Sequence, residues 1–216
     1  SGVGLRFADG DGAEFDQVIL ACHADQALAL IGAPHGSERA ILGAMRFQDN
    51  DAVLHADPAL MPRRKRVWSA WNFLRDSSAD RAGRASVTYW MNALQSIATP
   101  DPLLLSLNPP TAPRAALVHA TRRFRHPQFD AAAMAAQARL SEINGIDRLW
   151  FAGAWTGWGF HEDGIDSALA IAAAMGIAPP WTMPARHGRA APAVLVAADL
   201  AAARLQAAAD PSRLAA

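Results

Sequence analysis

Cysteine is almost absent from the sequence, and so are long uncharged apolar runs. Cys22 is the one cysteine among 216 residues, so the chain can form neither an internal disulfide nor a thiolate metal site; we expect Cys22 to be a small core residue. No stretch of 18 or more apolar residues is free of charge, so no transmembrane segment is predicted. A basic segment followed by an apolar run, as in a signal peptide, is also missing, and we expect a cytoplasmic protein. The chain opens at Ser1 without a methionine, which we interpret as the middle of a gene product.

A net charge is missing as well. Lys plus Arg number 20, as do Asp plus Glu, which gives no general reason to expect nucleic acid or an anionic membrane as a partner. Residues 63–66 form a local basic run, which we interpret as a solvated loop, with an anionic partner or lipid headgroup as the alternative. Hydrophobic residues make up 51% of the chain, a composition typical of a globular protein with a sizeable core.

The chain begins with a strand pattern. Apolar residues alternate at 3–7, turn residues follow at 9–12, and residues 15–21 end in an apolar run. This pattern predicts a β-hairpin whose second strand is buried on both faces, as in an α/β sheet. Short helices are predicted at about 25–31 and 37–44.

The middle of the chain is rich in aromatic and β-branched residues, which predict strands. The expected strands are 67–73, 85–91, 103–107 and 116–124. A polar loop at 75–84 separates the first two, so we expect an antiparallel meander. Asp130 is predicted to cap an alanine-rich helix that ends at 144–145.

The most informative segment is 149–168, in which an apolar strand leads through a glycine-rich loop into a helix. Glycine lets the backbone approach a ligand closely, and a helix N-terminus presents free N–H groups and the positive end of its dipole. A helix that begins at about 161–164 would stabilise an electron-rich edge such as N1/O2 of a flavin ring. An ordinary strand-to-helix turn without a ligand has the same bare pattern.

The residue sequence of this segment resembles that of a known family. The strand ends in Phe-Ala-Gly and the helix begins with Glu-Asp-Gly-Ile-Asp-Ser-Ala, which resembles the carboxyl-terminal FAD-binding motif of the flavin amine oxidases, the group of monoamine oxidase and phytoene desaturase. Residues 16–30 resemble the group's return strand and the start of its substrate domain. Further short segments are similar to those of a bacterial branch of flavin-containing amine oxidoreductases or NAD/FAD-binding proteins. These segments are residues 71–72, 88–95, 107–109, 126–127 and 159–164.

The resemblance, which covers roughly residues 1–180, implies a non-covalently bound FAD. The residues that it implies for cofactor binding are Gly153, Ala154, Trp155, His161, Glu162, Asp163, Gly164 and Ile165. Gly153 and Ala154 would lie near the pyrophosphate and ribityl chain, and the helix that opens at 162–165 would face the isoalloxazine. We expect the backbone to make these contacts, because the carboxylates of Glu162 and Asp163 would repel an anionic ring edge.

Substrate contacts are expected from Tyr89, Met91 and Trp158, with packing inside the substrate-domain sheet as the competing interpretation for residues 89 and 91. No catalytic residue is assigned, because the flavin itself takes the hydride in this chemistry. No metal is expected at 161–163, since adjacent side chains point in different directions. No nucleophile elbow supports a hydrolase.

The resemblance further implies an α/β fold in which an α+β substrate domain is inserted into a partial Rossmann-type FAD-binding domain. We assign residues 1–23 to return strands of the FAD-binding domain and 24–145 to the substrate domain. Residues 146–180 are assigned to the closing strand and helix, and 181–216 to a linker and an Ala-rich tail helix. The group's G-x-G-x-x-G fingerprint is absent, so we expect a missing N-terminal FAD-binding segment to anchor the ADP half.

The expected function is that of the carboxyl-terminal part of an FAD-dependent oxidoreductase. Such an enzyme oxidises a C–N or C–C bond of a small-molecule or lipid substrate by hydride transfer to flavin. One alternative is a flavin-dependent desaturase or isomerase that acts on a lipid. The other is a non-catalytic, truncated subunit that needs a separate FAD-domain partner; no nucleic-acid partner is expected in either case.

Overall fold

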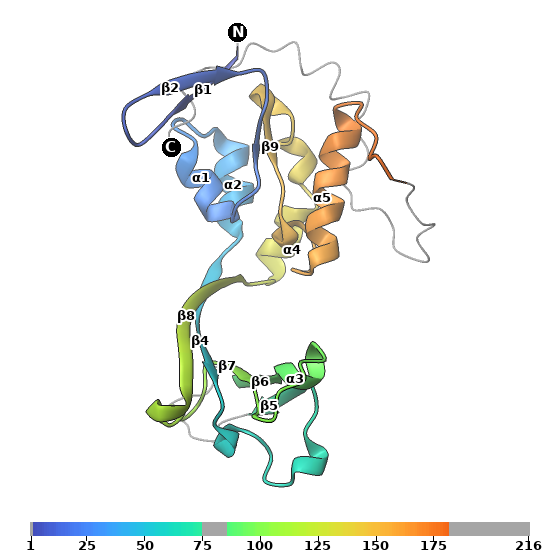
Figure 1. Ribbon diagram of the computed structural model, residues 1–216. Coiled ribbons are helices and arrows are strands. Elements are labelled where there is room, and N and C mark those ends of the chain that lie inside the picture. The colour runs from blue at the N-terminus through green and yellow to red at the C-terminus, as the bar shows by residue number, and fades with distance from the viewer. Residues whose placement is uncertain (1, 75–85, 182–216) are drawn as a thin grey trace. The chain divides into compact units, whose positions relative to one another are not determined.

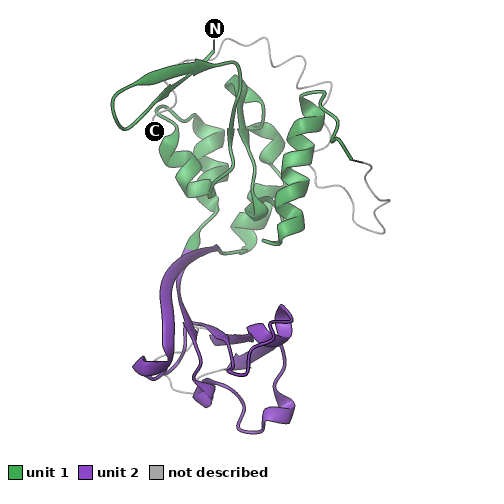
Figure 2. Ribbon diagram, viewed as in Figure 1, with its two compact units in different colours: residues 1–47, 127–216 green, residues 48–126 purple. Residues whose placement is uncertain are grey.

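The chain has a mixed α/β fold that is divided into two compact units (Figure 1). The computed structural model describes residues 2–74 and 86–181. Unit 1 consists of residues 1–47 and 127–216, and unit 2 consists of residues 48–126 (Figure 2). The polar loop predicted at 75–84 and the predicted tail helix lie outside the described residues.

Two short strands form the centre of unit 1. β3 (Val18–Leu20) and β9 (Leu149–Phe151) pair in parallel, with Ile19 opposite Trp150. Strands in parallel sheets are usually buried on both faces and are therefore apolar throughout, as the sequences Val-Ile-Leu and Leu-Trp-Phe are. The pairing confirms that the two segments belong to one parallel sheet.

Helices pack against both faces of this pair, although Ile19 of β3 stays half-exposed (Figure 1). Among the described residues, the helices of unit 1 are α1 (Ala24–Leu30), α2 (Gly36–Ala44), α4 (Ala131–Gln137) and α5 (His161–Ala174). Leu20, Leu149 and Phe151 share a core with α1, α2 and α4, whereas Trp150 and Ala152 pack with Ile171 of α5. None of the described helices has the length and apolarity that a membrane crossing needs.

The boundary between the units differs from the expected limits of the substrate domain at 24 and 145. Helices α1, α2 and α4 belong to unit 1, because Ala27, Ile41 and Ala133 are buried in the core that contains β3 and β9. Asp130 caps α4 as predicted, since its Oδ1 accepts a hydrogen bond of 2.9 Å from the Ala133 amide.

The amino-terminal hairpin is shorter than predicted. β1 (Val3–Arg6) pairs antiparallel with β2 (Gly12–Phe15), and two residues outside any strand separate β2 from β3. The predicted second strand, 15–21, is thus two strands in two different sheets. The division follows burial, because Val18 and Leu20 are buried whereas Phe15 is exposed.

Unit 2 is built on a five-stranded sheet with the order β5-β6-β7-β4-β8. The strands are β4 (Phe47–His55), β5 (Trp71–Leu74), β6 (Ser86–Trp90), β7 (Leu104–Leu107) and β8 (Val118–Pro127), and α3 (Met91–Leu94) follows β6. The antiparallel pairing of β5, β6 and β7 confirms the predicted meander. β4, which the sequence did not predict, pairs antiparallel with β7.

Short 3-10 turns connect these elements. They are η1 (Pro58–Leu60), η2 (Lys65–Val67), η4 (Ala115–Leu117), η5 (Leu140–Glu142), η6 (Ile146–Arg148) and η7 (Ala154–Thr156). Of these, η7 lies in the candidate functional site and η2 carries part of the basic run.

Candidate functional site

The segment that follows β9 folds as a tight loop in front of α5. The loop contains η7, and α5 begins at His161. Gly153 has a φ of 147° and Gly159 a φ of 88°, in the region of backbone space that favours glycine. A Cβ at position 153 would also lie 2.7 Å from the indole nitrogen of Trp155. Both the backbone conformation and this steric clash therefore favour glycine at position 153.

The carboxylate of Asp163 holds the end of the loop against the first turn of α5. Its Oδ2 accepts hydrogen bonds from the amides of Trp158, at 3.0 Å, and Phe160, at 2.9 Å. An acidic side chain in the first turn also interacts favourably with the helix dipole. Asp163 is buried, and its carboxylate is therefore engaged inside the loop.

Two further polar side chains brace the loop from its other side. Ser167 Oγ accepts a 2.9 Å hydrogen bond from the Gly153 amide and donates one of 2.7 Å to the Gly164 carbonyl. Gln137 of α4 donates from Nε2 to the carbonyls of Trp155, at 2.8 Å, and Gly157, at 2.6 Å. The backbone of the loop is thus fixed by hydrogen bonds from both neighbouring helices.

Several backbone amides at this site have no hydrogen-bond acceptor among the described residues, and three of them concern the start of α5. The N–H groups of Ala154, His161 and Glu162 make no hydrogen bond to any residue within 2–74 or 86–181. The last two are open because the first amides of a helix have no intrahelical acceptor. A Cβ at position 164 would lie 3.8 Å from the Ala154 nitrogen, an ordinary van der Waals distance, so Gly164 lies next to that amide. Open amides at the positive end of a helix dipole suit an anionic or electron-rich group.

Large exposed apolar side chains lie in the same loop and in the first turns of α5. Trp158, Phe160 and Ile165 are 54%, 60% and 51% exposed, although each lies in or next to a loop that is otherwise braced. The ring of Phe129 packs edge-to-face against Trp158, with 6.4 Å between centroids. Exposed apolar side chains around a few convergent polar groups are typical of a small-molecule site.

The structure brings the eight predicted cofactor residues together in unit 1, in different settings. His161, Glu162 and Ile165 are exposed. Trp155 is 3% exposed and lies in the core of unit 1, where its indole N–H donates to the Cys22 carbonyl at 3.0 Å. Its side chain therefore anchors the loop to the core of unit 1. Cys22 itself is half-buried at the edge of this core.

The predicted substrate residues are divided between the units. Trp158 lies in the loop before α5, whereas Tyr89 and Met91 belong to unit 2. Tyr89, half-buried on β6, packs edge-on against Trp71 with 5.1 Å between ring centroids. Met91 begins α3, and its amide donates to the Leu103 carbonyl at 2.8 Å.

A buried polar chain in unit 2 was missed by sequence reasoning. His55 Nδ1 accepts from the Asp57 amide at 3.0 Å, and His55 Nε2 donates to Ser106 Oγ at 2.8 Å, which lies 2.7 Å from Thr88 Oγ1. Burial lowers the pKa of His55 below the usual 6.5. Because all three side chains are fully buried, they stabilise the sheet and do not form a site that a solute could reach.

No group of three or more His, Cys, Asp or Glu side chains in the described part of the chain could hold a metal ion. A scan of the sequence against models of protein families finds no match, and a search of curated proteins finds none either. The geometry of the loop before α5 is therefore the main basis for a functional proposal.

Proposed function

We propose that the chain is the carboxyl-terminal part of an FAD-dependent oxidoreductase and that the loop before α5 seats the flavin ring. The observation that carries this proposal is the set of open amides of Ala154, His161 and Glu162 at the start of α5. Amide donors at a helix N-terminus are chemically suited to the electron-rich N1/O2 edge of an isoalloxazine. The resemblance of residues 149–168 to a flavin-binding motif supports the same assignment.

The residues around the amides fit a planar, largely apolar ring. The side chains of Trp158, Phe160 and Ile165 offer exposed apolar surface beside the donors. The Asp163 carboxylate is engaged by two backbone amides, so it holds the loop and does not compete for the open donors. FAD would supply the hydride acceptor for oxidation of a C–N or C–C bond. The chain would supply orientation and a fixed positive potential, with no side-chain acid or base required.

The sheet of unit 1 supports a role for an additional FAD-binding segment. Within the described residues β3 and β9 form a parallel sheet of two strands, and the side chain of Ile19 on β3 is 50% exposed. Parallel sheets normally have more strands and two covered faces. We propose that a segment with a G-x-G-x-x-G fingerprint adds strands beside β3–β9 and binds the ADP half of FAD.

A lipid desaturase or isomerase is the second candidate, and one feature of unit 2 favours it. Trp71 and Phe73 are 60% and 63% exposed on β5 and lie opposite Tyr89 and Val87 of β6. Alternate residues of a strand share a face, so these four side chains form an uncharged face. Such a face suits an alkyl or polyene chain better than an ammonium group.

Spectroscopy of a flavin-loaded protein tests the proposal. The polypeptide that contains this chain should be purified together with a nucleotide-binding segment, and its visible flavin absorbance recorded before and after anaerobic addition of donors. We expect bound flavin. Bleaching by amines supports the first candidate, and bleaching by acyl or polyene compounds supports the second. A protein without flavin under these conditions contradicts both.

A further inference from the structure

The basic run of unit 2 consists of four exposed cations that have no acidic partner in the part of the chain that the structure describes. Residues 63–66 are all exposed, and none makes an ion pair with a described residue. No acidic residue occurs between positions 58 and 74. Other arginines of the same unit differ, since Arg114, Arg123 and Arg125 pair with Asp57, Asp51 and Asp49. The positive charge of residues 63–66 is therefore available to an external anion.

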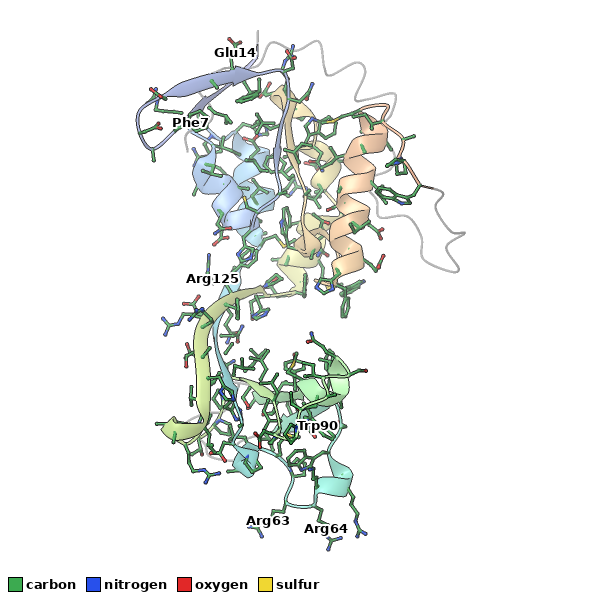
Figure 3. The ribbon with its side chains drawn as sticks, viewed as in Figure 1. Phe7, Glu14, Arg63, Arg64, Trp90 and Arg125 are labelled. Carbon is green, nitrogen blue, oxygen red and sulfur yellow. The ribbon has the colours of Figure 1, made fainter. Side chains whose placement is uncertain are left out.

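This run is held in a defined position by Trp68. The Trp68 indole N–H donates to the Pro62 carbonyl at 2.7 Å, and its ring packs edge-on against Trp90 with 5.4 Å between centroids. The ammonium of Lys65 lies 5.8 Å from the centroid of the same ring. The side chains of Arg63 and Arg64 point away from the strands of unit 2 (Figure 3). The cations are thus presented from a braced turn.

Exposed apolar side chains follow the cations directly. Val67 is 56% exposed, Trp71 is 60% exposed and Phe73 is 63% exposed. Trp71 and Phe73 share one face of β5, because alternate residues of a strand do so. Val67 lies four positions before Trp71, within about 14 Å even if the chain between them is extended. We call residues 63–73 the basic–aromatic segment.

We propose that the basic–aromatic segment docks unit 2 on the surface of an anionic lipid bilayer. Adjacent Lys and Arg side chains attract acidic headgroups, and Trp and Phe enter the boundary between headgroups and acyl chains. The chain as a whole is neutral, so the attraction is local to this segment. The proposal is independent of flavin binding by unit 1.

The same observations favour a bilayer over a nucleic acid. Nucleic-acid binding uses cations spread along a track that follows many phosphates, whereas these four cations are adjacent in one short turn. Val67 has no ring that could stack on a base, but its side chain suits an apolar boundary. A flat anionic surface is the partner that uses both the charged and the apolar residues of the segment.

Co-sedimentation of the full chain with lipid vesicles tests the proposal. We expect binding to vesicles of phosphatidylcholine with phosphatidylserine, weakened by salt, and little binding to phosphatidylcholine alone. The triple variant Arg63→Ser, Arg64→Ser, Arg66→Ser should bind the anionic vesicles about a hundredfold more weakly. The matched control is Arg6→Ser, Arg39→Ser, Arg122→Ser, which removes the same charge from exposed arginines elsewhere and should bind like the wild type.

A second variant tests the apolar half of the segment. Trp71→Ser with Phe73→Ser should weaken vesicle binding about tenfold or more at unchanged net charge. Equal sedimentation of wild type and arginine triple variant overturns the proposal, as does equal binding to neutral and anionic vesicles. Binding to a single-stranded RNA homopolymer without binding to anionic vesicles would overturn it in favour of a nucleic-acid surface.

Discussion

At the scale of single residues, unit 2 depends on polar side chains that are almost fully buried. The backbone amide of Asp57 donates to His55 Nδ1, which fixes the neutral imidazole with its proton on Nε2. That proton is donated to Ser106. A second proton on Nδ1 would face a donor, so the native sheet excludes the charged form of His55.

The pH dependence of stability should show this exclusion. Burial, with His119 adding to it and the Asp57 carboxylate opposing it, lowers the folded-state pKa of His55 from 6.5. Below that value the unfolded chain binds a proton that the folded chain does not, so stability is complete above pH 6.5 and falls as the pH decreases. Urea unfolding of the wild type and His55→Gln should be compared from about pH 8 to about pH 5. The wild type should lose more stability; parallel curves would contradict this account.

Asp57 provides a second test at this scale. Its carboxylate is 2% exposed and accepts hydrogen bonds from the amides of Ala59 and Arg114 and from the Arg114 guanidinium, which holds its pKa far below the usual value. Asp57→Asn should lower the free energy of unfolding at neutral pH by about 2 kcal/mol, because the charge-assisted bonds are lost. Asp51→Asn, at the half-exposed pair with Arg123, should change it less. Equal changes in urea unfolding would argue against a special role for Asp57.

At the scale of elements, the loop before α5 depends on how closely Gly157 approaches Asp163. A Cβ at position 157 would lie 2.6 Å from the Asp163 carboxyl carbon, and this carboxylate holds the amides of Trp158 and Phe160. Displacement of the carboxylate would therefore release the end of the loop.

Gly157→Ala should lower the free energy of unfolding by about 1–3 kcal/mol, the usual cost of overpacking a filled site. Gly36→Ala at the start of α2 is the matched control, because a Cβ there meets nothing within 4 Å and alanine favours a helix by about 0.5–1 kcal/mol. Thermal or urea unfolding of both variants measures the difference. Similar stabilities for the two variants would show that the approach of Gly157 to Asp163 does not matter.

The sequence predicts elements well where one periodicity dominates. The limits of α1 and α2, the β5–β7 meander and the Asp130 cap follow from local patterns and are confirmed. β4 was missed because its first half, Gln48 to Asp51, is polar and shows no alternation. It is a strand because β7 and β8 flank it in the sheet, which is a long-range effect.

At the candidate site, too, local patterns predict the elements but not the long-range contacts. The order of strand, glycine-rich loop and helix could be predicted, and so could the helix start near 161. The inward orientation of Trp155 could not, because it depends on a hydrogen bond to Cys22 from a distant part of the chain. The loop-bracing roles of Gln137 and Ser167 depend likewise on how α4 and α5 pack on the loop.

At the scale of the whole molecule, each unit carries one of the two proposed functional surfaces. Unit 1 presents open amides and exposed apolar side chains at the start of α5. Unit 2 presents the basic–aromatic segment. The flavin site at the start of α5 and the basic–aromatic segment involve different residues, so the failure of the flavin proposal leaves the membrane proposal standing.

The flavin content of a Gly164→Ala variant tests the central claim most directly. The added methyl group would lie 3.8 Å from the Ala154 nitrogen, an ordinary van der Waals distance that the fold accepts and that places apolar bulk next to the open amide. In a protein purified with the proposed nucleotide-binding segment, we expect Gly164→Ala to fold stably and to bind flavin about tenfold more weakly, the effect of one weakened hydrogen bond. Gly36→Ala should retain wild-type flavin binding, measured by visible absorbance during dilution. Unchanged flavin affinity in Gly164→Ala would contradict the assignment of the ring to the start of α5.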